Sequence, residues 1–409
     1  MTGTAAKLGD SHNFGRRVSM RGGRVKKPRT LLWEWLLLSR DSPLRKLLDA
    51  RAERDGWGSE AFGFLPTLEF FPSRSARPAR SGLGYERDGE VERLALEPLG
   101  RAHRRVKREL AVVLGRSLAL WSWLGVSDLH WENLALGVDE RGRVVFGPLD
   151  IELILADLSL PTQTKLLPDA DPEYAVICQH AAGVRRALPY LGKPVDVGDL
   201  LAMAGAYRAT LLFLERHAGA IGKVFVSLPG FRETPIRVCL RGTEEYVRAG
   251  EQPLWPPLLD AEAEQLARGD IPYFFRLYGK AGLHYFANRE LSKLGRLPLR
   301  GDVPKLDPLL PVTRGLRSAS RRTLREDGLF TLIGAFDDPS FKGRHREGEL
   351  ELTFGSRALS LELAGGELLR AARDLSPFVS SVYLPCRCGE VRSVFVPAVT
   401  KCRVRAGGV

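Results

Sequence analysis

The N-terminal part of the chain alternates short apolar and polar stretches that glycine and proline separate. Residues 16–20 and 24–27 have the composition of two short strands, and Gly22 and Gly23 between them suit a tight turn. This pattern predicts a β-hairpin. An apolar run over residues 31–39 follows, after a threonine that is placed to cap a helix, so we expect a helix there.

A longer helical pattern covers residues 101–124. Its apolar side chains recur at helical spacing: Val106, Leu110, Val113, Leu114, Leu118 and Leu120. The chain then enters a polar segment at residues 127–133. Residues 134–138 and 143–146 alternate like the strands of a second hairpin. The polar segment is therefore expected between a helix and a pair of strands.

The rest of the chain predicts a change of architecture near residue 300. Residues 160–300 have a largely helical pattern with one strand-like piece at 235–240, whereas several stretches further on alternate like strands. We therefore expect an α+β chain with soft boundaries near residues 110 and 300. These boundaries divide it into residues 1–110, 111–302 and 303–409.

Composition narrows the class of protein without identifying a reaction. The 409 residues suffice for two or three domains, and 44% hydrophobic with 27% charged residues suit a globular chain. The net charge of +12 indicates either an attraction to phosphates and acidic partners or a genome that favours arginine codons. No nucleic-acid-binding motif accompanies the charge, so we expect no nucleic acid partner.

Cysteine use and hydropathy favour a cytoplasmic location. The five cysteines are few, odd in number and scattered, which suits a reducing compartment. The chain starts without an apolar signal segment, and no apolar run is long enough to span a bilayer. Cys386, Cys388 and Cys402 offer three thiols, but a complete structural zinc site usually needs four ligands, so we expect small buried or surface cysteines.

Asp128, Asn133 and Asp150 form the clearest chemical signal. A kinase catalytic loop needs an aspartate beside the substrate hydroxyl and an asparagine five residues later for a metal ion. A further aspartate after a strand pair holds Mg²⁺ against the nucleotide phosphates. The three residues meet these requirements in type, order and setting. The competing interpretation is a solvated polar turn after a helix.

Lys27 is the candidate for the strand lysine that holds the α and β phosphates in kinases. Gly9 and Gly15, together with the hairpin, would cover the nucleotide. A kinase also needs a glutamate that pairs with this lysine. Glu34 on the next helix is the preferred candidate and Glu53 the alternative. A strand lysine before a proline is more often a surface charge, but its position ahead of the catalytic-loop segment favours the phosphate role.

Five blocks of sequence, in one order along the chain, resemble the dehydratase domain of class II lanthipeptide synthetases. They span about residues 9–275 and read Gly9-Asp-Ser-His12 with Gly15-Arg16, Lys27-Pro-Arg29, Asp128-Leu-His130 through Glu132-Asn133 with Asp150-Ile-Glu152, Arg237-Val-Cys-Leu-Arg241-Gly-Thr243 with Tyr246, and Gly269-Asp-Ile-Pro-Tyr-Phe274. A single block would be weak support. The ordered set is far more specific.

The resemblance implies a two-lobed, lipid-kinase-like fold that uses ATP and Mg²⁺. Residues 1–110 would form the N-lobe with the hairpin and Lys27, residues 111–302 the C-lobe, and residues 303–409 a small β-containing appendix of unassigned role. Asn133 and Asp150 would hold the metal. The resemblance assigns phosphoryl transfer to four residues of the C-lobe: Asp128, His130, Asn133 and Asp150.

The implied reaction dehydrates Ser and Thr of a precursor peptide in two steps. Phosphorylation by ATP replaces hydroxide, a poor leaving group, with phosphate. A base then removes the α-proton while cationic and hydroxyl groups stabilise the developing charge, which leaves dehydroalanine or dehydrobutyrine. The resemblance assigns this elimination to Asp10, His12, Arg237 and Thr243. Arg237 can bind phosphate through two hydrogen bonds, although Arg237 and Thr243 also fit an exposed strand face.

The resemblance also sets expectations about partners. Eight residues precede Gly9, so the family's N-terminal extension is missing, supplied by another chain, or lost to a misassigned start codon. The cyclase domain is missing too, so we expect a precursor peptide with a leader and a separate cyclase as partners. The alternatives are a kinase-like phosphotransferase that stops at the phosphoryl product and a nonenzymatic kinase-like subunit that binds the peptide. The intact kinase residues argue against the nonenzymatic subunit.

Overall fold

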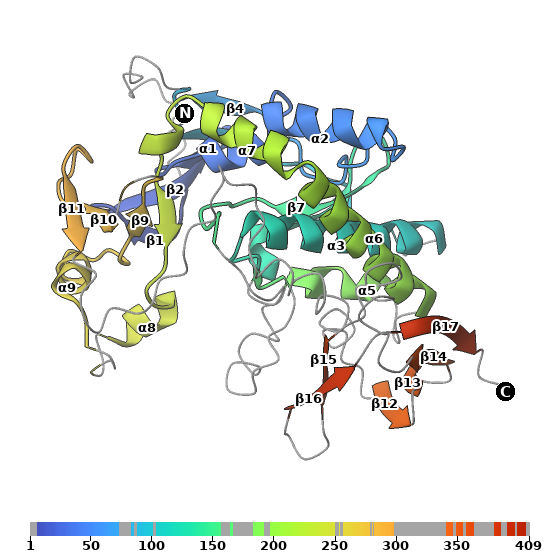
Figure 1. Cartoon of the computed structure of the whole chain (residues 1–409). Coiled ribbons are helices and arrows are strands. Elements are labelled where there is room, and N and C mark those ends of the chain that lie inside the picture. The colour runs from blue at the N-terminus through green and yellow to red at the C-terminus, as the bar shows by residue number, and fades with distance from the viewer. Residues whose placement is uncertain are drawn as a thin grey trace.

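The structure is a computed structural model in which helices and strands are mixed along the chain, so the expected α+β class is confirmed. It describes residues 6–72, 83–85, 88–100, 104–156, 164–166, 183–191, 197–249, 253, 257–278, 280 and 282–297, and after these the six strands β12 to β17. Figure 1 shows the arrangement of these elements.

A five-stranded antiparallel sheet forms the N-terminal part, with the strand order β1-β2-β3-β5-β4. Its strands are β1 (Ala6–His12), β2 (Arg16–Arg21), β3 (Arg24–Lys27), β4 (Phe70–Pro72) and β5 (Gly89–Glu92). The pairing of β2 with β3 confirms the hairpin predicted at residues 16–27. The sequence pattern did not predict β1, which pairs with β2 through an irregular register.

Two helices follow the hairpin, α1 (Leu32–Leu38) and α2 (Pro43–Arg54). The expected helix at residues 31–39 is confirmed with slightly shorter bounds. Thr30 Oγ1 accepts a hydrogen bond from the Leu32 backbone nitrogen at 3.3 Å, although the cap position itself is Leu31. Ser42 caps α2, because its hydroxyl accepts hydrogen bonds from two backbone nitrogens at 3.1 Å.

The centre of the molecule is built from α3 (Arg104–Leu124), the hairpin of β6 (Leu134–Val138) and β7 (Val144–Pro148), α5 (Leu188–Leu191), α6 (Val197–Arg216) and α7 (Ala218–Ser227). The predicted helix and hairpin are thereby confirmed. Figure 1 shows α6 running alongside α3, and the two helices are in extensive contact. One continuous core cluster contains buried residues from Leu31 to Ile236. This core crosses residue 110, where the boundary between lobes was predicted.

Gly115 allows the close approach of α3 and α6. A Cβ atom at this position would lie 2.1 Å from the backbone oxygen of Met203 and 3.0 Å from the backbone nitrogen of Tyr207. Because neither backbone can give way, Gly115→Ala is expected to lower the free energy of unfolding by about 1–3 kcal/mol. Gly219→Ala in α7 is the matched control, since nothing lies within 4 Å of its Cβ. This control should gain up to about 1 kcal/mol from helix propensity, and urea denaturation measures both.

A second antiparallel sheet, in the order β11-β10-β9-β8, closes one side of the molecule. It comprises β8 (Ile236–Val238), β9 (Phe274–Arg276), β10 (Leu283–Phe286) and β11 (Leu294–Leu297), with α8 (Thr243–Arg248) and α9 (Asp260–Ala267) beside it at the left of Figure 1. The strand expected at 235–240 is confirmed. The largely helical expectation for residues 160–300 missed the other three strands, because strands this short depend on distant partners.

The C-terminal strands are β12 (Phe341–Arg346), β13 (Glu349–Phe354), β14 (Arg357–Leu363), β15 (Ser380–Pro385), β16 (Val391–Val396) and β17 (Val399–Arg405). They confirm the β-containing character expected of this part. The segments around Cys386 and Cys388 lie outside the described residues, so the cysteine expectation is untested. Across the described chain, no helix has the length and apolarity needed to cross a membrane.

Candidate functional site

Lys27 and Glu34 form a buried ion pair. Lys27 is the last residue of β3 and is 6% exposed, whereas Glu34 in α1 is fully buried. The Lys27 Nζ atom lies 3.0 Å from Oε1 and 2.8 Å from Oε2 of Glu34. The interpretation of Lys27 as a surface charge is therefore wrong. The structure selects Glu34, rather than Glu53, as the partner of this lysine.

Arg29 stands at the centre of a network of ion pairs. Its Nη2 atom lies 2.8 Å from Glu34 Oε1 and also contacts Asp150 Oδ1. Its Nε atom contacts Glu152 Oε1. Three carboxylates thus converge on one guanidinium that is only 7% exposed. A planar fork of donors can serve several acceptors at once, which a lysine ammonium at this position would not do in the same geometry.

Asp150 directly follows Leu149, whose backbone contacts both Lys27 and Asn133. The carbonyl oxygen of Leu149 accepts a hydrogen bond from Lys27 Nζ at 2.6 Å, and the nitrogen of Leu149 donates to the Asn133 carbonyl at 2.8 Å. Burial alone would raise the pKa of Asp150, but Arg29 and Lys27 outweigh this effect and hold the pKa well below its usual range. The Asp150 carboxylate is therefore charged at neutral pH.

Asn133 and Asp150 offer oxygen ligands that suit Mg²⁺. The Asn133 Nδ2 atom donates to the carbonyl of Asp128 at 3.0 Å, which leaves the amide oxygen outside that bond. Mg²⁺ is usually held by one or two protein ligands together with substrate phosphates. The described residues contain no cluster of three or more His, Cys, Asp or Glu side chains that could hold a metal. A magnesium ion at Asp150 would therefore depend on the nucleotide for further ligands.

Asp128 has a left-handed backbone, with a φ of 68°. Such a conformation costs a non-glycine residue on the order of 1–3 kcal/mol and is concentrated at functional sites. The Asp128 carboxylate is accessible, and Lys165 Nζ lies 3.2 Å from its Oδ1 atom. His130 is partly exposed, and its Nδ1 atom lies 4.0 Å from Glu132 Oε2. Asp128 is thus open to a substrate hydroxyl, whereas His130 has only this distant partner among the ion pairs found.

Arg237 belongs to the same network. Glu152 uses its Oε1 atom for Arg29 and its Oε2 atom for Arg237 Nη1, at 2.9 Å. The side chain of Arg237 is only 15% exposed, so the exposed-strand interpretation of this residue is wrong. Trp33 in α1 donates from its ring nitrogen to the carbonyl of Pro235 at 2.8 Å, just before β8. The helix that carries Glu34 therefore also anchors the strand that carries Arg237.

His12 has a hydrogen bond that determines its tautomer. Its Nδ1 atom lies 2.8 Å from the carbonyl oxygen of Ile271. Because a carbonyl only accepts, Nδ1 carries the proton and Nε2 of the neutral ring has a free lone pair. Burial, reinforced by Arg237, lowers the pKa of His12. The ring is therefore neutral at pH 7 and can accept a proton at Nε2, while Asp10 nearby is exposed.

Thr243 is exposed at the start of α8, and no hydrogen bond or ion pair among the described residues joins it to Arg237. Its neighbours in the matched block bind a buried carboxylate instead. Arg241 Nε lies 3.0 Å and the Tyr246 hydroxyl 2.7 Å from Glu262 Oε1. Arg241 and Tyr246 thus hold α8 against α9, and the assignment of Thr243 to elimination stays a prediction.

Asp270 holds the loop between β1 and β2. Its carboxylate accepts hydrogen bonds from Ser11 Oγ at 2.8 Å, from the Phe14 nitrogen at 2.6 Å and from the Gly15 nitrogen at 2.9 Å. Gly9 in β1 and Gly15 in this loop have positive φ angles of 69° and 79°. Residues of the last matched block therefore brace the glycine-containing loop that was predicted to cover the nucleotide. That covering role stays a prediction.

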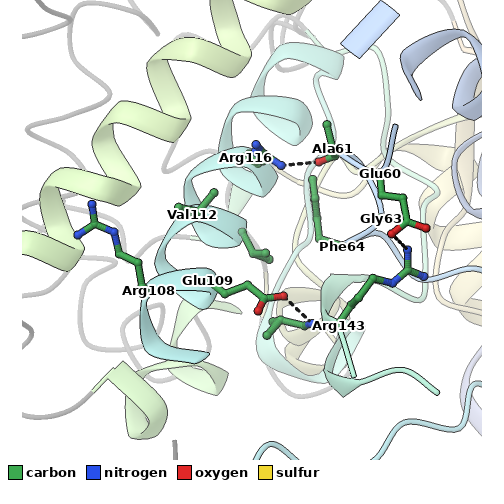
Figure 2. A pocket seen from close by; sticks show the side chains of 11 residues that line it. Glu60, Ala61, Gly63, Phe64, Arg108, Glu109, Val112, Arg116 and Arg143 are labelled. Atoms are coloured by element: carbon green, nitrogen blue, oxygen red, sulfur yellow. Dashed lines mark hydrogen bonds and ion pairs between the residues drawn. The ribbon is translucent and has the colours of Figure 1, made fainter. Parts of the chain in front are cut away.

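A pocket of about 470 Å³ lies elsewhere, between α3, residues 60–64 and the start of β7. Figure 2 shows two of its charged side chains directed at partners: Arg116 at the carbonyl of Ala61, and Arg143 at Glu60. No residue of the Arg29 network lines it. We place the candidate chemistry at the network rather than in this pocket, because Lys27, Glu34 and Asp150, three of the predicted kinase residues, meet there.

Sequence reasoning missed the contacts of Arg29, Glu152 and Asp270. All three lie within matched blocks, and Arg29 and Glu152 each stand two residues from an assigned residue, Lys27 and Asp150. No assigned residue stands near Asp270 in the sequence. Comparison with known proteins adds no family: no protein-family model matches the chain, and no match was found among curated proteins.

Proposed function

We propose that this protein is a lanthipeptide-type dehydratase that phosphorylates Ser and Thr of a precursor peptide with Mg-ATP and then eliminates the phosphate. The observation that carries the proposal is the buried Lys27–Glu34 ion pair next to Asp150. This is the arrangement a kinase needs for its phosphate lysine and metal aspartate. The ordered sequence blocks and the link from Asp150 through Arg29 and Glu152 to Arg237 support the same proposal.

In the first step, Lys27 would position the nucleotide phosphates while Asn133 and Asp150 hold Mg²⁺. The metal, when bound, neutralises charge on the transferred phosphoryl group. Asp128 is open to solvent and would accept the proton of the substrate hydroxyl as that oxygen attacks the γ-phosphorus. Glu34 keeps the Lys27 ammonium extended toward the site through its two short contacts.

In the second step, a base would remove the α-proton of the phosphorylated residue. The electron pair of the broken Cα–H bond would form the Cα–Cβ double bond as the Cβ–O bond breaks and phosphate departs. The neutral His12 ring carries its proton on Nδ1, so its unprotonated Nε2 atom can act as such a base. Arg237 would stabilise the departing phosphate by exchanging its contact with Glu152 for the phosphate oxygens.

Calorimetry of nucleotide binding tests the first step without the peptide. We expect the protein to bind ATP in a Mg²⁺-dependent manner. Asp150→Asn should weaken this binding at least tenfold, because the metal loses its anionic ligand, and Lys27→Met should do the same through lost phosphate contacts. Asp139→Asn, on the β6–β7 turn, is the matched control and should bind as the wild type does.

The result that would sink the kinase half of the proposal is ATP binding that neither variant changes. Thermal denaturation of each variant with and without nucleotide separates loss of binding from loss of fold. A folded variant that no longer gains stability from Mg-ATP has lost the site itself.

A second candidate is a kinase-like phosphotransferase that stops at the phosphoryl product. The exposure of Asp10 and Thr243 favours it, because two of the four residues assigned to elimination lie outside the buried network. Mass spectrometry of the peptide product distinguishes the two. A peptide that gains phosphate and does not later lose it by elimination supports the phosphotransferase.

A further inference from the structure

Tyr273 is a buried tyrosine whose hydroxyl has no partner in the described part of the chain. The residue is 2% exposed and directly precedes β9, and none of its hydrogen bonds involves the hydroxyl group. The one bond it makes is from its backbone nitrogen to Gln265 Oε1, at 2.9 Å. The hydroxyl oxygen is not among the fully buried side-chain atoms that lack a partner, so it keeps some exposure and can meet a ligand.

Its ring lies beside two residues that the proposed function uses for elimination, His12 and Arg237. The ring centroid is 5.8 Å from that of His12, with the planes tilted by 60°. The guanidinium carbon of Arg237 lies 5.2 Å from the same ring centroid. The phenol therefore stands beside both the candidate base and the candidate phosphate ligand.

The Tyr273 phenol keeps its proton at neutral pH. Burial raises the pKa of Tyr273 well above its usual range, and Glu152 raises it further, while Arg237 and Arg29 oppose this rise. The hydroxyl can therefore donate a hydrogen bond, and it carries no charge.

We propose that Tyr273 is a further catalytic residue, whose hydroxyl donates a hydrogen bond to the phosphate of the phosphorylated intermediate as that phosphate leaves. This inference rests on the proposed function. His12 takes the α-proton, the released electron pair forms the Cα–Cβ double bond, and the Cβ–O pair leaves with the phosphate. Tyr273 keeps its proton throughout and, with Arg237, stabilises charge that grows on the leaving oxygen.

The aromatic neighbours give the phenol a rigid position. The Phe275 ring lies 6.2 Å from that of Tyr273, and Tyr273, Phe275 and Leu277 form one buried cluster on a single face of the strand. Ile271, two residues earlier, holds His12 through its carbonyl oxygen. One short segment therefore orients the base and supplies the donor, which is what a preorganised site requires.

Tyr273→Phe tests this role because it removes one oxygen and keeps the ring. The first probe is inorganic phosphate, the leaving group itself, titrated with the full-length protein in the presence of Mg-ADP and followed by ³¹P NMR. The wild type should bind phosphate, and Tyr273→Phe should bind it about tenfold more weakly, because a hydrogen bond to a charged group is lost. The second probe is a synthetic phosphoserine peptide, whose release of phosphate should slow by about tenfold to a hundredfold.

Tyr246→Phe is the matched control. It removes the same oxygen from a tyrosine whose hydroxyl bonds to the buried Glu262 at 2.7 Å. This variant should lower the melting temperature and leave phosphate binding and phosphate release per folded molecule unchanged. A merely structural role for the Tyr273 hydroxyl would give the opposite pattern, with a changed melting temperature and unchanged phosphate affinity.

Mg-ADP binding, measured on the same samples, separates the two levels of the proposal. If Mg-ADP binds and phosphate binds equally well to the wild type and Tyr273→Phe, the role of Tyr273 is overturned while the nucleotide site stands. If the wild type binds no Mg-ADP, the proposed function fails and this inference fails with it.

Discussion

Asp128→Ala is expected to return a precursor peptide unmodified under conditions in which the wild type removes water from it. Loss of a positioned general base costs about a hundredfold to ten-thousandfold in rate, the largest effect on activity that we expect. The structure provides the reason, since the Asp128 carboxylate is open to substrate and its strained backbone is held by Asn133. Asp41→Ala, an exposed aspartate on the loop after α1, is the matched control and should behave as the wild type.

Arg237→Ala should give a different product from the same experiment. Because the proposed function has Arg237 act only when phosphate departs, its loss should leave phosphorylation largely intact and slow elimination by about a hundredfold, or about 3 kcal/mol. Mass spectrometry should then show peptide that carries phosphate. Equal loss of both steps in Arg237→Ala would contradict the separation of roles, and would mean that the network around Glu152 serves both reactions as one unit.

Arg29→Met is expected to lower the free energy of unfolding by about 3–5 kcal/mol, the largest effect on stability. The variant leaves Glu34, Asp150 and Glu152 facing one another without their shared cation, and removing one partner of a buried ion pair leaves uncompensated charge. Methionine has a similar length and cannot replace the contacts. Urea denaturation at neutral pH measures the difference.

The pH dependence of this loss tests its electrostatic origin. Arg29 and Lys27 hold the pKa of Asp150 below that of the unfolded chain, so this carboxylate stabilises the wild type above the unfolded pKa. The contribution is lost as pH falls through the folded pKa. The difference between the wild type and Arg29→Met should therefore be greatest near neutral pH and shrink in acid.

The control for Arg29→Met is an exposed arginine. Arg141→Met removes a side chain that is 70% exposed and pairs with a half-exposed Glu60. A surface ion pair contributes up to about 1 kcal/mol, so this variant should stay close to the wild type at every pH. If both arginine variants lose the same small amount, Arg29 is not the centre that its contacts indicate.

Much of the local structure could be predicted from sequence patterns. The hairpin of β2 and β3, the helices α1 and α3, and the hairpin of β6 and β7 all came from hydrophobic period and glycine placement. These elements are local, because a helix bonds within itself and a tight hairpin bonds between neighbours. The partnership of Lys27 with Glu34 was also predictable, since seven residues separate them and the turn between strand and helix brings them together.

The second sheet and the long-range contacts of the site could not be predicted, because they join residues that are far apart in sequence. The short strands β9, β10 and β11 depend on pairing with one another and with β8. A pattern of three or four residues does not indicate which distant strand will be its partner. Asp270 bonds to Ser11 across 259 positions, and His12 to Ile271 across the same distance. Residue types at these positions were visible, but nothing in them specified contact.

The sequence by itself determined which chemical groups this protein has and the order in which they occur along the chain. The tertiary structure alone decided that Arg29 binds three carboxylates and that Glu152 bridges Arg29 and Arg237. It also decided that the Tyr273 ring lies beside both His12 and Arg237. The physical reason is burial. A charge removed from water needs an oppositely charged or hydrogen-bonding partner, and the folded core determines which distant group supplies it.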